Sequence, residues 1–323
     1  MNSLATNLPD RIHIVIPLFN DWLALGLLLE RINAVVPRPV RGRLAFLIVD
    51  DCSPVNYDHS LPTGVGQSLA VLRLFRNVGH QKAIALGLAY LADQPDPYPA
   101  IVMDADGEDR PEDILTLLQT AAEQPGRVVF AHRAKRHESL TFRVFYRVYK
   151  TVFRLLTGKV ITFGNFSYVP PTLLRKLAHV SEIWNNYPGG VIRSRLPYTS
   201  VPLERGRRLA GESKMNFVSL ILHGLSAVSV LMDTTAVRLV LFCVGMVVFS
   251  VLGIGVVLFM KLFAHTAIPG WASSLASLFL VVMLQAFLIT LLLVFMVLTY
   301  RTQPQFIPAR HYADFVERVE RVY

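Results

Sequence analysis

The sequence predicts an α/β protein with a mostly parallel sheet, followed by a basic juxtamembrane segment and a pair of membrane-spanning helices. Short apolar runs alternate with helical patterns through the first half of the chain, and polar residues follow several of these runs directly. Two long stretches without a charged residue lie near the C-terminus. Alternating strands and helices favour parallel strands joined by right-handed crossovers.

Composition limits the class of protein. The chain has 323 residues, is 53% hydrophobic and carries a net charge of +9, with a mean hydropathy of +0.43. It is too apolar for an ordinary soluble protein, and its charge suggests a membrane surface or a phosphorylated substrate as partner. Cys52 and Cys243 form no disulfide or metal pattern, which favours a reducing compartment. The first residues show no signal segment.

The expected elements follow from apolar runs and their boundaries. The first expected helix covers residues 22–35. A second follows the polar stretch 76–81 and ends at residue 91, and a third begins at residue 111. Strands are expected at 12–17, 44–49, 69–75, 101–103 and 128–131.

The stretch 101–113 is the centre of this interpretation. An apolar strand runs directly into Asp104, Asp106, Glu108 and Asp109. Ligand sites in open α/β sheets lie at the carboxyl edge of the strands, and Mg²⁺ or Mn²⁺ is commonly held there by one or two carboxylates together with substrate phosphates. Taken alone, the acids fit solvated loop residues equally well.

Other polar strand ends strengthen the metal interpretation. They are Asn20 with Asp21, Asp50 with Asp51, Asn77, and Asp104 with Asp106. Such ends meet at one edge of a parallel sheet and are typical of a nucleotide-type site.

Basic segments follow this region. Residues 135–159 mix cations with aromatic side chains, which fits either an exposed amphipathic helix or a helix on the membrane surface. Residues 164–167 are expected to form a short loop, residues 205–214 a basic loop, and residues 217–231 an interfacial helix.

Residues 239–260 and 275–299 are long enough and apolar enough to cross a bilayer. Cations flank this pair while its connection is poor in them, so the positive-inside rule places both termini and the catalytic domain in the cytoplasm. The predicted divisions are a domain at 1–204, a basic loop and interfacial helix at 205–235, two spans at 236–300 and a cytoplasmic tail at 301–323.

Four segments resemble motifs of family 2 glycosyltransferases in the family's order. They are IVIPLFND, IVDDCSP, LFRNVGHQKAIALGL and DADGEDRPED, beginning at residues 14, 48, 74 and 104. With the two C-terminal spans, the chain is similar to the polyprenyl-phosphate branch, the undecaprenyl- and dolichol-phosphate sugar transferases.

This resemblance implies a GT-A fold and inverting, metal-dependent transfer of a sugar from a nucleotide-sugar donor to a polyprenyl phosphate. Asp104, Asp106 and Asn165 are the implied catalytic residues, and Asp104, Asp106 and Glu108 are the implied ligands of Mg²⁺ or Mn²⁺. Binding of the acceptor and of the phosphates is assigned to Arg133, Arg147, Arg208 and Lys214. Binding of the nucleotide sugar is assigned to Pro17, Asn20, Asp50, Asp51, Lys82, Asp104 and Asp106.

Three departures from the family pattern accompany the resemblance. Asn165 stands where some relatives carry an aspartate with an assigned base or positioning role, Gly107-Glu108 replaces Leu-Gln, and Arg110 replaces a proline. A phosphate monoester is mostly a dianion at neutral pH, so either no base is needed or Asn165 positions a substrate by hydrogen bonds.

Two alternatives remain at this stage. One is a catalytically inactive membrane scaffold on a transferase fold, and the other is a processive polysaccharide synthase, which usually carries a Q-x-x-R-W motif and more spans. The expected partners are the donor, the lipid acceptor, the bilayer, a homo-oligomer, a separate flippase and a downstream transferase, but no nucleic acid.

Overall fold

The computed structural model describes residues 8–55, 61–133, 140–159, 163–211, 217–263 and 270–323. The side chains of 133, 140–146, 148–149 and 217–223 are outside this description. The chain divides into two compact units. The first comprises residues 1–142, 161–230 and 305–323, and the second comprises residues 143–160 and 231–304.

An eight-stranded mixed sheet, in the order β7-β5-β6-β4-β1-β2-β3-β8, forms the middle of the first unit. Four neighbouring pairs are parallel, and the pairs β4–β6, β5–β6 and β3–β8 are antiparallel. The strands are β1 (Ile12–Leu18), β2 (Leu44–Asp50), β3 (Ser68–Leu74), β4 (Ala100–Val102), β5 (Val128–Arg133), β6 (Phe163–Val169), β7 (Tyr198–Leu203) and β8 (Val316–Arg321).

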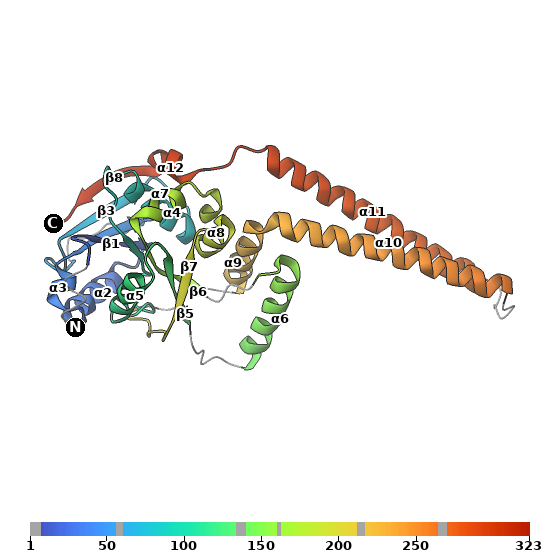
Figure 1. The fold of residues 1–323 in the computed structure, drawn as a ribbon, viewed down its shortest axis with the longest axis horizontal. Helices are drawn as coiled ribbons and strands as arrows, with labels where there is room; N and C mark the ends of the chain where they lie inside the picture. Colours follow the sequence, from blue (N-terminus) through green and yellow to red (C-terminus); the bar gives the residue numbers. More distant parts are fainter. Residues whose placement is uncertain (1–7, 56–60, 134–139, 160–162, 212–216, 264–269) are drawn as a thin grey trace. The chain divides into compact units, whose positions relative to one another are not determined.

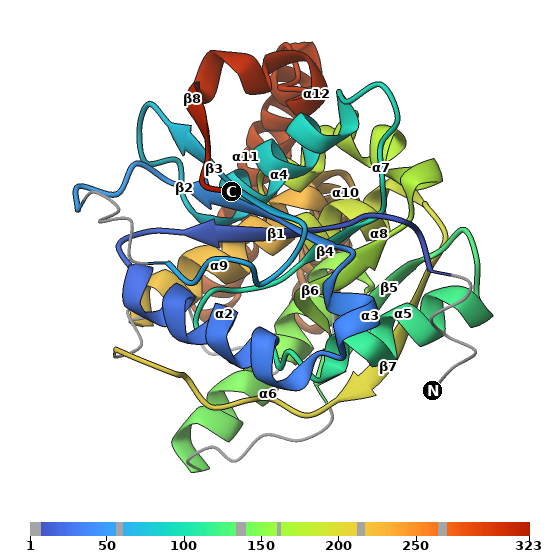
Figure 2. The same ribbon diagram turned by 90° about the vertical axis from the view of Figure 1, so that its left-hand side faces the viewer.

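Helices cover both faces of this sheet (Figures 1 and 2). One apolar layer packs α2 (Trp22–Val35) and α5 (Asp113–Glu123) against the sheet, and the other packs α4 (His80–Ala92), α7 (Pro171–Ala178) and α8 (Tyr187–Ser194). Successive side chains of a strand point to opposite faces of the sheet and so contribute to both layers. In β1, Ile14 and Ile16 belong to the first layer and Val15 belongs to the second. The predicted α/β class is therefore confirmed.

The remaining elements of this unit are short, apart from α9 (Phe217–Val230). They are α3 (Arg38–Arg41), η1 (Ser181–Trp184), α12 (Pro308–His311) and η2 (Tyr312–Phe315). Residues 204–211 contain no helix or strand, as predicted for the described part of the basic loop.

Two predictions differ from the structure. Residues 164–167 belong to β6, because this segment pairs antiparallel with both β4 and β5 and buries Phe166 and Ser167. The predicted tail 301–323 includes β8, which pairs with β3 at the edge of the sheet (Figure 1). Glycine, asparagine and serine suggested a loop at 164–167, and the alternation Val-Glu-Arg in β8 was too short to indicate a strand.

The second unit contains α6 (Leu140–Thr157), α10 (Met232–Phe263) and α11 (Trp271–Thr302). The two long helices pack closely where Gly253 lies against the ring of Phe279, since a Cβ on this glycine would come within 2.4 Å of the ring. In the most apolar 18-residue window of α10 and of α11, 17% and 6% of residues are buried. Core helices of soluble proteins are mostly buried, so these two suit a lipid environment.

Arg238 connects α10 to the end of α6 within this second unit. Its guanidinium donates to the carbonyl oxygens of Arg154 at 3.2 Å and Leu155 at 2.7 Å. These carbonyls lie in the last turn of α6, where the Arg154 carbonyl also accepts a hydrogen bond from Gly158 N–H at 2.8 Å, so the arginine helps to cap the helix.

Candidate active site

Acidic side chains gather where the central parallel strands end. β4 lies beside β1, and β1 lies beside β2, all three parallel. Their carboxyl ends therefore bring Asp21, Asp50 and Asp104 to one edge of the sheet, as the sequence predicted.

The turn after β4 is built by its own acids. Gly107 adopts a φ of +81°, which glycine accepts readily. Asp109 is buried and accepts a hydrogen bond from the backbone N–H of Asp104 at 2.9 Å, while Asp106 accepts one from the N–H of Glu108 at 3.0 Å. Asp109 thus shapes the turn that presents Asp104 and Asp106, a role that composition alone did not separate from theirs.

The basic loop 204–211 lies against this acidic turn. Arg208 forms ion pairs with Asp21 at 2.5 Å and with Asp106 at 3.2 Å, and Arg205 pairs with Glu108. The loop also donates backbone hydrogen bonds, from Leu209 N–H to the Asp106 carbonyl at 2.9 Å and from Gly206 N–H to the Glu108 carbonyl at 2.8 Å. Acids from the first half of the chain and arginines from the basic loop therefore form one cluster.

Electrostatics make this cluster receptive to positive charge. Burial and the negative charge of Asp104 raise the pKa of Asp106, although Arg208 and Arg205 act in the opposite direction. Added positive charge at Asp106 would favour the ionised carboxylate, as metal coordination does.

Asn165 is connected to the acids through His80. The backbone N–H of Tyr187 donates to Gln81 Oε1 at 2.7 Å, and Gln81 Nε2 donates to Asn165 Oδ1 at 3.0 Å. Asn165 Nδ2 lies 2.9 Å from His80 Nε2, which is 3.2 Å from Asp104 Oδ1. Burial lowers the pKa of His80. The negative charges of Asp104, Asp106 and Asp51 have the opposite and larger effect, so the pKa of His80 is raised overall. The sequence interpretation missed both His80 and Gln81, although they stand in the R-N-x-G-H-Q segment.

The turn after β2 is anchored by its two aspartates. Asp51 accepts hydrogen bonds from the backbone N–H groups of Val78 at 2.7 Å and Gly79 at 2.8 Å, so it joins this turn to the loop before α4. Burial raises the pKa of Asp51 and these two donors lower it, with a net raised value. Asp50 is buried and accepts from the N–H of Ser53 at 2.9 Å.

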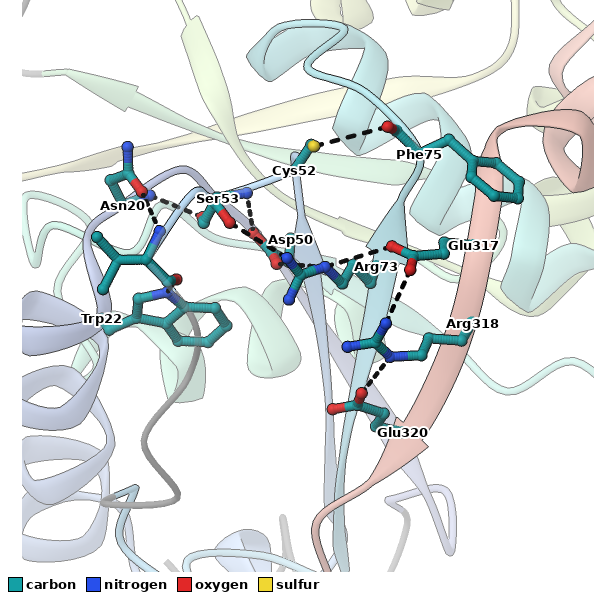
Figure 3. A network of polar contacts seen from close by, with 11 residues as sticks. Asn20, Trp22, Asp50, Cys52, Ser53, Arg73, Phe75, Glu317, Arg318 and Glu320 are labelled. Atoms are coloured by element: carbon teal, nitrogen blue, oxygen red, sulfur yellow. Dashed lines mark hydrogen bonds and ion pairs between the residues drawn. The ribbon is translucent and has the colours of Figure 1, made fainter.

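A polar network extends from this turn to the C-terminal strand (Figure 3). Arg73 on β3 donates to the Ser53 carbonyl at 3.3 Å, lies 3.9 Å from Asp50 and 3.4 Å from Glu317 of β8. The N–H of Asn20 donates to Ser53 Oγ at 2.9 Å. No motif or pattern in the sequence indicated that a residue beyond the second apolar helix supports this turn.

The other predicted site residues lie in different surroundings. Pro17 is buried in β1, and the Lys82 ammonium lies 5.2 Å from the centre of the Trp184 ring. Arg133 ends β5, and its side chain is not described; Lys214 lies outside the described residues. Arg147 is exposed on α6 in the second unit. Of the four predicted phosphate-binding cations, Arg208 is the one that the structure describes beside the acidic turn.

The donor set suits a divalent metal that shares its coordination with phosphate. In the described part of the chain, no three His, Cys, Asp or Glu side chains are grouped to hold a metal by themselves. Asp104 and Asp106 nevertheless supply two hard carboxylates on one turn, and Mg²⁺ commonly binds one or two carboxylates plus substrate phosphates. The residues fit such an ion.

The chain belongs to glycosyltransferase family 2. The family model "Glycosyl transferase family 2" matches residues 13–184, just over half of the chain and the region that holds the acidic turn, the β2 turn and Asn165. With the mixed sheet covered on both faces, this match confirms the predicted GT-A fold, and the protein is a glycosyltransferase.

Among curated proteins, an uncharacterized glycosyltransferase, YkcC, of Bacillus subtilis is 26% identical over 270 residues, 80% of each chain. An undecaprenyl-phosphate 4-deoxy-4-formamido-L-arabinose transferase of Photorhabdus laumondii is 30% identical over 152 residues, 46% of this chain and 45% of that protein. The chain therefore spans about half the length of that relative. A glucosyl-3-phosphoglycerate synthase structure from Mycobacterium tuberculosis, with Mn²⁺, UDP-glucose and phosphoglyceric acid, matches 72% of this chain and 82% of that chain at 15% identity and a TM-score of 0.49.

Proposed function

We propose that this glycosyltransferase transfers a sugar, with inversion at the anomeric carbon, from a nucleotide-sugar donor to a polyprenyl phosphate of the undecaprenyl type. The reaction takes place at the cytoplasmic face of the membrane and requires Mg²⁺ or Mn²⁺. The observation that carries this proposal is the cluster of Asp104, Asp106 and Arg208 in a family 2 domain that is followed by two long apolar helices. Relatives named for transfer to undecaprenyl phosphate support the choice of acceptor.

The acidic turn and the basic loop have complementary roles toward the donor. Asp104 and Asp106 would hold the divalent ion, which supplies charge neutralisation at the diphosphate of the leaving nucleotide. Arg205 and Arg208 provide guanidinium groups that match phosphate oxygens in pairs. Together these groups stabilise the negative charge that grows on the nucleotide as the bond to the sugar breaks.

The acceptor needs positioning more than activation. A phosphate monoester has its second pKa near 6, so at neutral pH one of its oxygens can attack the anomeric carbon without giving up a proton. A single attack from the face opposite the leaving nucleotide inverts the configuration. The hydrogen bond that Asn165 accepts from Gln81, together with its close contact with His80, supports a positioning role for this residue.

The membrane arrangement remains part of the proposal. Cations outside the two spans favour cytoplasmic termini, and two helices offer no route for carrying a sugar across the bilayer. A separate flippase and a downstream transferase would therefore complete the pathway. Assembly into homo-oligomers belongs to the same proposal.

The decisive experiment measures sugar transfer to undecaprenyl phosphate by the purified full chain reconstituted in membranes. UDP- and GDP-sugars would be tested with Mg²⁺, with Mn²⁺ and with EDTA. We expect a metal-dependent lipid-linked product from one donor, lost in Asp106→Asn and retained in the matched control Glu123→Gln, which changes an exposed acid at the end of α5. No product from any donor, together with no nucleotide binding, would favour the inactive scaffold.

The same assay tests Asn165. We expect Asn165→Ala to lower kcat about tenfold, the effect of losing hydrogen bonds worth about 1.4 kcal/mol. A loss as complete as that of Asp106→Asn would contradict the positioning role and indicate that Asn165 takes part in the chemistry.

A further inference from the structure

We propose that Arg208 couples the binding of the divalent metal to the binding of the donor diphosphate. Its guanidinium is the counter-charge of Asp106 and Asp21. A divalent ion held by Asp106 would take the place of this guanidinium as counter-charge, and Arg208 would then be available to bind the diphosphate of the donor. The inference rests on the proposed function and adds to it a coupling in which metal and nucleotide raise each other's affinity.

The position of Arg208 is set by the backbone around it. Its Nε donates to the carbonyl of Ala210 at 2.9 Å, and the next residue, Leu209, donates its N–H to the carbonyl of Asp106. A Cβ on Gly206 would come within 2.5 Å of the Gly107 carbonyl, so the two segments approach as closely as glycine allows. The guanidinium therefore does not reach the acids by the chance arrangement of a long exposed side chain.

The ion pairs are sheltered enough to matter. The side chains of Arg208, Asp21 and Asp106 are 22%, 24% and 19% exposed. Partly buried pairs are screened less by salt than surface pairs, and the guanidinium bridges two carboxylates on different segments. A metal ion that needs an Asp106 oxygen must compete with this bridge.

The competition changes when a diphosphate is present. If only a metal ion binds, the positive charge of the displaced guanidinium lacks a negative partner, because the metal adds further positive charge to the same cluster. A nucleoside diphosphate supplies anionic oxygens that arginine binds in pairs. Metal binding without nucleotide is therefore weakened by Arg208, whereas metal binding with nucleotide is not.

This mechanism requires reciprocal coupling, because two ligands that affect each other's affinity do so by the same factor. The nucleotide should raise the affinity for metal, and the metal should raise the affinity for nucleotide. A static ion pair that only supports the fold predicts no change in metal affinity when the arginine is replaced, beyond any loss of stability.

The test is direct measurement of Mn²⁺ binding to the purified full chain by electron paramagnetic resonance of the free ion, with and without UDP or GDP. The wild type is compared with Arg208→Gln, which keeps a polar side chain and removes the charge. Arg207→Gln is the matched control, because Arg207 is exposed in the same loop and removes the same charge. Arg208→Lys keeps the charge at the site.

We expect Arg208→Gln to bind Mn²⁺ alone about tenfold more tightly than the wild type, and to gain less affinity when nucleotide is added. Arg207→Gln should behave like the wild type, whereas Arg208→Lys should fall between the wild type and Arg208→Gln, because lysine keeps the charge but cannot make paired contacts. Equal or weaker binding of Mn²⁺ alone by Arg208→Gln, with unchanged coupling to nucleotide, would overturn the inference while leaving metal-dependent transfer intact.

Two further outcomes decide the matter if Arg208→Gln does not fold. Wild-type protein whose Mn²⁺ affinity is unaffected by either nucleotide lacks the coupling, and this result refutes the inference on its own. Absence of Mn²⁺ binding under every condition would instead refute the metal dependence on which the proposed function rests.

Discussion

At the residue scale, His13 shows how burial determines the protonation of a side chain within the sheet. It lies on β1, with the ring of Tyr98 6.2 Å away and Arg11 stacked over that tyrosine. Burial, assisted by the positive charge of Arg11, lowers the pKa of His13 to about 4. The folded state therefore holds a neutral imidazole over a pH range in which the unfolded chain is protonated.

We predict that the catalytic domain loses stability as the pH falls from 7 to 5, partly through His13. Between a pKa near 6.5 in the unfolded chain and about 4 in the folded state, unfolding takes up a proton, so stability is fully present at higher pH and declines toward pH 4. The expected loss from this group at pH 5 is about 2 kcal/mol at most. Thermal unfolding of the full chain followed by tryptophan fluorescence measures it.

The variant His13→Gln should flatten this pH dependence, whereas His179→Gln, at an exposed position, should leave it unchanged. The same slope in His13→Gln as in the wild type would show that other groups are responsible.

Gly107 links the residue scale to the element scale, because it lets the basic loop approach the acidic turn. Its φ is +81°, and an added Cβ would lie 2.4 Å from Leu209 Cγ. Gly126 has a similar φ of +75° but nothing within 4 Å of an added Cβ. A substitution at Gly126 would therefore cause backbone strain alone, whereas a substitution at Gly107 would also push against the loop.

We predict that Gly126→Ala costs about 1 kcal/mol of stability through its left-handed backbone alone. Gly107→Ala should cost more and should also displace residues 204–211, which would lower sugar transfer and let trypsin cleave the loop more readily at its arginines. Limited proteolysis and thermal unfolding of both variants measure these effects. Equal trypsin sensitivity of the two variants would mean that the loop does not depend on close contact at Gly107.

At the element scale, β8 extends the sheet from the far end of the chain. Pairing with β3 places Glu317 beside Arg73, and Arg73 in turn lies beside the buried Asp50. Phe75 N–H donates to the Phe315 carbonyl at 3.0 Å, which adds one hydrogen bond beyond the paired residues of β3 and β8. A strand that follows the two long apolar helices in sequence thus supports the turn that we assign to the nucleotide.

We predict that Arg73→Gln destabilises the domain by about 3 kcal/mol, because it leaves the buried carboxylate of Asp50 without its counter-charge. It should also raise the KM for the donor if this turn holds the nucleotide. Arg321→Gln, at an exposed position of β8 outside this network, is the control and should leave thermal unfolding nearly unchanged. A mild effect of Arg73→Gln, similar to that of the control, would argue against the network in Figure 3 as a support for the turn.

At the scale of the whole molecule, α10 and α11 are long enough and apolar enough to cross a membrane, and the topology that we propose for them can be tested. We predict that a fluorescent protein fused after Tyr323 folds in the cytoplasm, and that alkaline phosphatase inserted at His265 is active outside the membrane. The reason is the excess of cations outside the spans and their scarcity in the connection. The opposite pattern of reporters would place the catalytic domain outside and exclude a cytosolic nucleotide sugar as donor.

The architecture was predictable where a pattern is local. Apolar runs such as Leu44–Asp50 identify buried strands, because a strand covered by helices on both faces cannot expose polar side chains. The acids after β4 and the family motifs likewise lie in short continuous segments. Length and the absence of charge identified both apolar helices for the same reason.

The site was less predictable where its parts come from distant segments. Sequence selected Asp104, Asp106 and Arg208 separately, but only the folded chain places the loop arginine between Asp21 and Asp106. Asp109, His80 and Gln81 gain their roles through hydrogen bonds across the turn or to β6 and α8. Neither hydropathy nor spacing reports such contacts.

The sequence alone therefore determined the class of this protein: a parallel-rich α/β domain with carboxylates at its strand ends, basic segments and two apolar helices. Local periodicity and composition carry that information, because they reflect how each segment meets water, lipid or the core. Only the tertiary structure decided that 164–167 is a strand, that the C-terminal residues complete the sheet, and that Arg208 faces the acids. These outcomes depend on pairing and charge contacts between segments far apart in the chain, which no single stretch encodes.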